Sequence, residues 1–156
     1  GLLAEAMKLA VGAGRKGCNV AQKILGGTPE PLNYEIVPNT IFSIPEVASV
    51  GLNEEKAKAG GLDYVAGKAL MSSSAKALIL GNRDGFAKIL ADRKSGKILG
   101  IHIVGEKATE LIAEASLALS QNLTLDDFTE NLHSHPILGE VVKDACEACK
   151  ALYKNQ

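Results

Sequence analysis

The feature that most constrains the fold is a pair of strand-like segments joined by a short turn. Residues 86–92 and 97–104 are rich in aliphatic side chains, and Arg-Lys-Ser-Gly at 93–96 is typical of a hairpin loop. Side chains alternate along a strand, so one face of the second segment is aliphatic. The residues on that face are Leu99, Ile101 and Ile103. Two strands joined this closely run antiparallel, so we expect an antiparallel sheet.

Further extended segments precede this hairpin. Residues 40–44, 48–52 and 62–71 have the composition of short strands, and a Ser-rich turn follows at 72–74. Asn53 is the expected N-cap of a short helix that ends at two glycines. The sheet is therefore expected to contain more strands than the hairpin alone.

Three helices are expected after the hairpin. Apolar spacing predicts one over 107–121, and Thr124 followed by acidic residues predicts a short capped helix to Thr129. The last helix is expected to start at Pro136, because proline suits the first helical turn. Its apolar side is predicted to carry Leu138, Val141, Val142, Ala145, Cys149 and Leu152. This order predicts an α+β fold, an antiparallel sheet with helices packed on one face.

The N-terminal part is expected to be separate from this domain. Apolar spacing predicts a helix from about residue 2 to 25, and the glycine pair at 26–27 is a C-cap signal followed by prolines. We therefore predict three parts. They are a helix over 1–27, a connector over 28–39 and the main domain over 40–156.

Charge and cysteine content exclude several classes of protein. Seventeen basic and eighteen acidic side chains give a net charge of -1, which argues against nucleic acid as a partner. No apolar run reaches the ~20 residues that cross a bilayer, so no membrane association is expected. Three cysteines are too few for a disulfide scaffold, and an odd number cannot all pair within one chain. A reducing compartment is expected: the cytoplasm, or the mitochondrial matrix in a eukaryote.

Two motifs that look chemical have simpler interpretations. Residues 12–17 match G-x-G-x-x-G, but dinucleotide binding needs a strand before the motif, and the preceding residues are predicted to be helical. Close helix packing is the favoured reason for these small residues. Cys146 and Cys149 form a C-x-x-C inside the last predicted helix, whereas a redox pair usually lies at a helix N-terminus. Ordinary buried thiols are favoured there.

The most unusual local chemistry is His133-Ser134-His135-Pro136. No credible set of zinc ligands accompanies it, so no metal site is predicted. In a structural interpretation, one histidine caps the helix and the other is satisfied in the core. In a catalytic one, His135 stands just before the helix, whose dipole lowers its pKa. Glu140 would then bind one ring nitrogen and leave the other as a base.

Those two influences on His135 oppose each other, so the sign of its net pKa shift stays open at this point. The spacing of five residues to Glu140 permits the contact without requiring it. His102 lies inside a predicted strand and is expected to be structural.

Several segments together carry a family resemblance. Residues 133–140 match H-x-H-P-x-L-x-E, and residues 45–51 match P-E-V-A-x-V-G. Residues 98–103 match I-L-G-x-H-I, and residues 110–115 match E-L-I-x-E-A. Over nearly its whole length the chain resembles dihydrolipoamide dehydrogenases, which are flavin-dependent pyridine nucleotide–disulfide oxidoreductases. The resemblance implies their C-terminal dimerisation domain, preceded at 1–27 by the last helix of the FAD-binding domain.

The resemblance also implies roles for individual residues. His135 is expected to take a proton from a thiol of dihydrolipoamide, with Glu140 orienting it and His133 as a supporting neighbour. The His135–Pro136 bond is expected to be cis. The stretch that aligns with a flavin-contacting segment is Lys8, Leu9, Ala10 and Val11. The pair would serve the disulfide and flavin of the opposite subunit, which implies a homodimer.

The parent reaction implied is the FAD- and NAD-dependent oxidation of dihydrolipoamide to lipoamide. Expected partners are the FAD and NAD domains of the parent chain and the lipoyl domain of a 2-oxoacid dehydrogenase or glycine cleavage complex. These 156 residues hold neither the FAD fingerprint nor the redox-active disulfide, so the chain alone is expected to be inactive and to bind no cofactor. Two alternatives stay open: the interface domain of a glutathione reductase-like enzyme, or a stand-alone self-association module without catalysis.

Overall fold

The chain divides into two compact units, Gly1–Val37 and Pro38–Gln156. The computed structural model describes residues 10–154, and side chains from 12 to 153. The first unit holds helix α2 (Ala10–Ile24) and the single-turn helix η1 (Tyr34–Ile36). The predicted stop at the glycine pair is confirmed, because Gly26 adopts a φ of +83° and the Gly27 N–H donates to the Gln22 carbonyl. The predicted start near residue 2 lies outside the described residues.

The G-x-G-x-x-G match at 12–17 lies inside α2. Residues 10 and 11 directly before it are helical, so the part of the chain described has no strand leading into the motif. This confirms the prediction that the motif is helical. A side chain added at Gly14 or Gly17 would meet nothing within 4 Å, so no close packing at these two glycines is seen.

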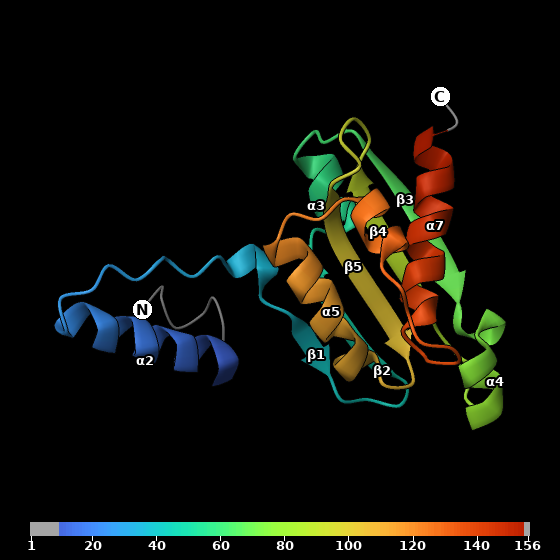
Figure 1. Ribbon diagram of the computed structural model, residues 1–156, viewed down its shortest axis with the longest axis horizontal. Helices are drawn as coiled ribbons and strands as arrows, with labels where there is room; N and C mark the ends of the chain where they lie inside the picture. The colour runs from blue at the N-terminus through green and yellow to red at the C-terminus, as the bar shows by residue number, and fades with distance from the viewer. Residues whose placement is uncertain (1–9, 155–156) are drawn as a thin grey trace. The chain divides into compact units, whose positions relative to one another are not determined.

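The second unit is built on a five-stranded antiparallel sheet (Figure 1). The strands are β1 (Asn39–Ile41), β2 (Glu46–Gly51), β3 (Tyr64–Leu70), β4 (Phe86–Asp92) and β5 (Ile98–Gly105). Their spatial order is β1-β2-β5-β4-β3, and every pairing is antiparallel. The β4–β5 hairpin predicted from the sequence therefore forms the middle of the sheet.

One strand position departs from the predicted alternation. Leu90 pairs with Gly100 and Ala91 pairs with Ile98, so Leu99 has no partner on β4. This bulge puts Ile98 in the core and leaves Leu99 only half-buried. The prediction that Leu99 lies on one face with Ile101 and Ile103 by simple alternation is wrong for this reason.

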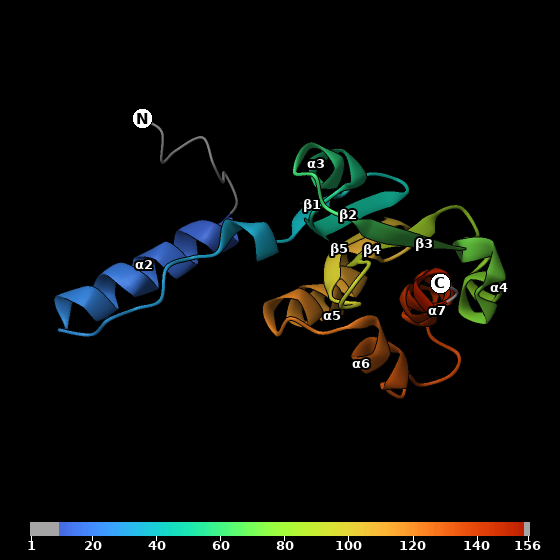
Figure 2. The same cartoon turned by 90° about the horizontal axis from the view of Figure 1, so that it is seen from above.

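Helices cover the two faces of the sheet unequally. The helices of this unit are α3 (Glu54–Ala59), η2 (Met71–Ser73), α4 (Ala75–Leu80), α5 (Ala108–Ser120), α6 (Leu125–Glu130) and α7 (Glu140–Lys154). Figure 2 shows α5, α6 and α7 on one side of the sheet and the short α3 on the other. Helix α5 packs on β2 and β5, and α7 packs on β3 and β4. The predicted α+β fold, with its main helices on one face, is confirmed.

Helix α4 was not predicted. The sequence indicated only a Ser-rich turn at 72–74, but Ser74 is a buried N-cap whose hydroxyl accepts the Ala77 N–H. Gly81 ends this helix with a φ of +73°. Six residues are too few for a clear helical period, and three of them, Leu78, Ile79 and Leu80, stay exposed.

The core lies between the sheet and helices α5 and α7. Its largest sheet residues are Val50, Val65, Ile89, Ile98, Ile101 and Ile103. The helices bury small and branched residues against them, namely Ile112, Ala115, Ala118, Val141, Val142, Ala145, Cys146 and Cys149. Leu152, predicted on the same side of α7, is 54% exposed, because the helix has by then passed the edge of the buried surface.

The close approach of α7 to β3 depends on one glycine. A Cβ added at Gly67 would lie 2.2 Å from the Cys149 nitrogen and 2.5 Å from the Ala145 oxygen. Both atoms belong to the backbone of α7, so neither can move without shifting the helix. Gly67 therefore allows α7 to rest directly on the strand.

The opposite face of the sheet carries a polar row across all five strands. The row, in register, is Asn39, Ser49, His102, Lys88 and Lys68. His102 Nε2 lies 3.0 Å from the Leu52 carbonyl oxygen, and Lys88 pairs with Glu54 of α3. His102 is thus held by the backbone, as its structural interpretation predicted.

Candidate functional site

His133 and His135 lie on the segment between α6 and α7, residues 131–139, called here the site segment, and Glu140 is the first residue of α7. The prediction that α7 starts at Pro136 is wrong, because the helix begins at Glu140. The Val141 N–H donates to the Leu138 carbonyl, three residues back, so a tight turn precedes the helix. The predicted cis His135–Pro136 bond is present.

Because α7 starts late, its dipole does not act on His135 as the sequence predicted. His135 lies five residues before the first helical residue, and a helix dipole acts only within the first turn. The chemistry of His135 is therefore set by its immediate neighbours.

His135 and Glu140 form what we call the outer pair. The ring Nδ1 lies 2.8 Å from Glu140 Oε1, and Glu140 Oε2 accepts the Ile137 N–H at 2.9 Å. The hydrogen bond from His135, followed by that from Ile137, holds the pKa of Glu140 below its ordinary value. The His135 side chain is 70% exposed, whereas that of Glu140 is 25% exposed.

The outer pair has the arrangement of an oriented base. An ionised carboxylate only accepts hydrogen bonds, so His135 donates through Nδ1–H. In the neutral ring, Nε2 then keeps its lone pair, and no hydrogen-bond partner for it is found among the described residues. The exposed nitrogen can take a proton from a group in solution or on another molecule. The contact between His135 and Glu140, which spacing alone left open, is therefore made.

His133 and Glu114 form a second pair, called here the inner pair. His133 Nε2 lies 2.9 Å from Glu114 Oε1, and the His133 side chain is only 6% exposed. The ring packs 5.9 Å, centroid to centroid, from Phe128 of α6. The same Glu114 oxygen accepts the side-chain N–H of Asn131 at 3.3 Å. Glu114 stands on α5, so it ties the start of the site segment to the helix that packs on the sheet.

Glu114 lies in the E-L-I-x-E-A match, but no local pattern assigned it a role. It lies 19 residues from His133, a separation that no local helical or strand period links. Only the packing of α5 beside the site segment brings them together.

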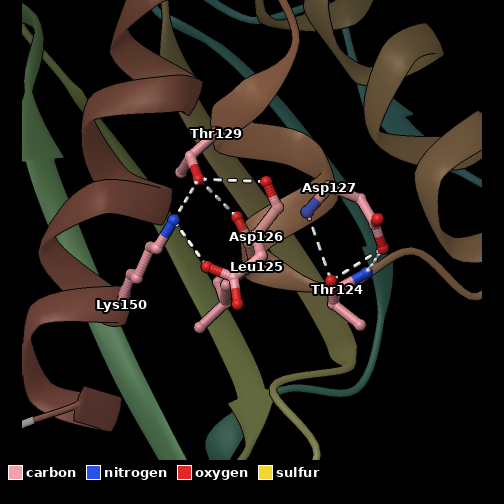
Figure 3. A network of polar contacts seen from close by, with 6 residues as sticks. All are labelled: Thr124, Leu125, Asp126, Asp127, Thr129 and Lys150. Carbon is pink, nitrogen blue, oxygen red and sulfur yellow. Dashed lines mark hydrogen bonds and ion pairs between the residues drawn. The ribbon is translucent and has the colours of Figure 1, made fainter.

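A polar network fixes α6 on α7, and so fixes the span of the site segment (Figure 3). Lys150 of α7 donates to the Thr129 hydroxyl at 2.9 Å and forms an ion pair with Asp126. At the other end of α6, Thr124 and Asp127 form a reciprocal capping box, as Figure 3 also shows. The cap expected at Thr124 is thus confirmed.

The C-x-x-C pair lies away from this site, in the core. Cys146 and Cys149 are both free thiols and fully buried. Burial raises the pKa of Cys149 to about 11 and raises that of Cys146 as well. Since the thiolate is the reactive form, both thiols are unreactive in the folded chain, as the interpretation as ordinary buried thiols predicted.

The predicted flavin-contacting stretch lies at the edge of the described residues. Lys8 and Leu9, of the predicted flavin-contacting stretch, lie outside the described residues, and of Ala10 and Val11 only the helical backbone is described. Within residues 10–154, no cluster of three or more His, Cys, Asp or Glu side chains could hold a metal ion. None of the helices described is long and apolar enough to cross a membrane.

Known proteins are similar to this chain in sequence and in fold. Dihydrolipoyl dehydrogenase of Trypanosoma brucei brucei is 43% identical over 129 residues, which are 83% of this chain and 27% of that protein. The enzyme of the same name from Halobacterium salinarum is 41% identical over 147 residues, 94% of this chain and 31% of that protein. The chain therefore spans about a third of the length of these relatives.

Solved structures have a similar fold. LpdA from Mycobacterium tuberculosis superposes with a TM-score of 0.85 at 27% identity, over 90% of this chain and 31% of that chain. The flavoprotein disulfide reductase RclA from Escherichia coli shares the fold, with a TM-score of 0.73 at 21% identity, over 82% of this chain and 30% of that one.

The family itself is matched over most of the second unit. Residues 37–146 match the dimerisation domain of pyridine nucleotide-disulphide oxidoreductases, and the relatives from Trypanosoma brucei brucei and Halobacterium salinarum are both named dihydrolipoyl dehydrogenase. The predicted boundaries at 27 and 39 stay predictions. The sequence, the antiparallel sheet and these matches agree that the chain belongs to the pyridine nucleotide-disulphide oxidoreductases, as their dimerisation domain.

Proposed function

We propose that this chain supplies the proton-transfer pair of a dihydrolipoyl dehydrogenase, with His135 as the base and Glu140 as the residue that orients it. The observation that carries the proposal is the 2.8 Å contact between His135 Nδ1 and Glu140 Oε1 on a ring that is 70% exposed. A base that is oriented on one side and open on the other suits a substrate that arrives from outside the domain.

The proposed step is a proton transfer. His135 Nε2 takes the proton from a thiol of dihydrolipoamide, so the ring becomes an imidazolium and the sulfur a thiolate. The thiolate is the form that attacks a disulfide, breaking the S–S bond and releasing one of its sulfurs as a thiolate. Glu140 stabilises the imidazolium through Nδ1–H. Carrying the electron pair is the chemistry that FAD and NAD supply when bound to the parent enzyme.

The proposed function also requires a second copy of the chain, in a homodimer. Several large apolar side chains are exposed near the site segment and on α4, and a homodimer would bury such surface. They include Leu78, Ile79, Leu80 and Leu132. A lipoyl domain is the proposed source of substrate, and a reducing compartment, the cytoplasm or the mitochondrial matrix, is the proposed location.

A domain exchange tests this proposal. Residues 38–156 replace the matching part of the Halobacterium salinarum dihydrolipoyl dehydrogenase, and the chimera is checked for dimer size and bound flavin. We expect it to oxidise dihydrolipoamide rather than glutathione. We also expect His135→Gln to lower kcat by about 10²-fold or more. A flavin-loaded, dimeric chimera that keeps its rate after His135→Gln would contradict the proposal. If the large graft fails to fold, a graft of residues 108–146 makes the same test.

A further inference from the structure

We propose that Glu114 is a positioning residue, which acts through His133 to hold the site segment in the shape that presents His135. The proposal deepens the function proposed above and rests on it. Nothing in the family match or in the names of the relatives assigns a role to Glu114.

The two histidines of the site segment differ sharply in burial. His133 and His135 are two residues apart, yet their side chains are 6% and 70% exposed. A buried imidazole is costly unless its nitrogens are hydrogen-bonded. Glu114 Oε1 lies 2.9 Å from Nε2, and the Asn131 carbonyl oxygen lies 3.2 Å from Nδ1. The inner pair therefore fixes which of the two rings faces inward.

Two hydrogen bonds from the site segment meet at Glu114. Its Oε1 accepts from the His133 ring and from the Asn131 side chain. These donors lie at the start of the site segment, whereas Glu140 binds Ile137 and His135 at its end. The segment is thus tied at both ends, and each tie comes from a carboxylate on a helix that packs on the sheet.

The helix that carries Glu114 is firmly packed on the sheet. Its neighbours Ile112 and Ala115 are buried in the core, and Glu46 of β2 binds the Thr109 N–H and hydroxyl at the first turn of α5. A carboxylate on so firmly seated a helix can set the position of a segment without touching the substrate.

The first test uses the chain itself, with Glu114→Ala, Glu114→Gln and a matched control, Glu110→Gln. Glu110 is exposed on the same helix. We expect the N–H signal on His133 Nε2 to be lost in the NMR spectrum of Glu114→Ala. Amide exchange over 132–135 should become about 10-fold faster, while exchange in β4 and β5 stays unchanged. Glu114→Gln keeps an oxygen acceptor and should keep the signal, and Glu110→Gln should change neither readout.

The second test uses the chimera described above. We expect Glu114→Ala to lower kcat by about 10-fold or more, because a small displacement of a reacting group is costly, with KM changed less than about 2-fold and flavin content unchanged. Glu114→Gln should recover most of the rate. If His135→Gln is inactive but Glu114→Ala turns over like the parent chimera, the role of Glu114 is wrong and the proposed function stands. If His135→Gln is fully active, both are wrong.

Discussion

Helix α7 and the site segment before it are held to the same sheet by opposite kinds of contact. The helix rests on β3 through small, buried residues and a backbone approach that only Gly67 permits. The site segment buries Leu138, but its two histidines are held by two carboxylates, Glu114 and Glu140. The first contact carries stability, and the second sets the presentation of one exposed ring. Changes in the helix contact should therefore unfold the domain, whereas changes in the segment should alter chemistry and leave the fold intact.

The strongest way to break the helix contact is Gly67→Ala. The added methyl would overlap the backbone of α7, so the helix must shift, and we expect a loss of about 3 kcal/mol in the free energy of unfolding, measured by urea denaturation. Gly14→Ala is the matched control, because its methyl points into open space in α2. That change should leave the main domain's transition where it was. Equal stability of the Gly67→Ala chain and the wild type would contradict the packing described here.

The reactivity of the cysteines measures how firmly α7 stays packed on the sheet, and it needs no mutation. The pKa of Cys149, raised by burial to about 11, cuts its thiolate fraction at neutral pH by about two orders of magnitude from that of an ordinary cysteine. Cys18 is exposed in α2. A thiol reagent should therefore label one cysteine per chain quickly and the other two at least about 100-fold more slowly. Three equally fast thiols would show that α7 does not stay on the sheet.

The smallest effect on stability is expected at the outer pair. The folded pKa of Glu140 lies below its ordinary value, so the hydrogen bonds to its ionised form contribute fully above about pH 4.3. That contribution is lost as the pH falls through the lower, folded pKa. The Ile137 amide signal should follow this step. Glu140→Gln should remove the step and barely move the melting temperature, while Glu147→Gln, at an exposed position on α7, should preserve it. Persistence of the step in Glu140→Gln would assign it to another group.

Local patterns predicted the parts of the fold that depend on near neighbours. The hairpin, the Asn53 and Thr124 caps and the stop at Gly26 each rest on a few adjacent residues, and each is found. The errors lie where a local signal is overridden by another nearby contact or is too short to read. Pro136 suits a first helical turn, but the Glu140 carboxylate binds Ile137 and the helix starts at Glu140 itself. Helix α4 was too short to show a period.

The candidate site divides in the same way. The outer pair joins residues five apart, so their spacing alone made the contact possible, and the structure shows that the contact is made. The inner pair joins residues 19 apart on different elements, and no local pattern connects them.

The amino-acid sequence by itself determined the antiparallel sheet, the helices that cover it and the histidine proposed here as the base, because these follow from the alternation, caps and motifs of neighbouring residues. The tertiary structure alone decided which histidine is buried and which is open, and how closely α7 approaches β3. Those outcomes depend on contacts between segments far apart in the chain, such as Gly67 with Cys149 and Glu114 with His133. Such contacts exist only once the sheet and its helices have packed.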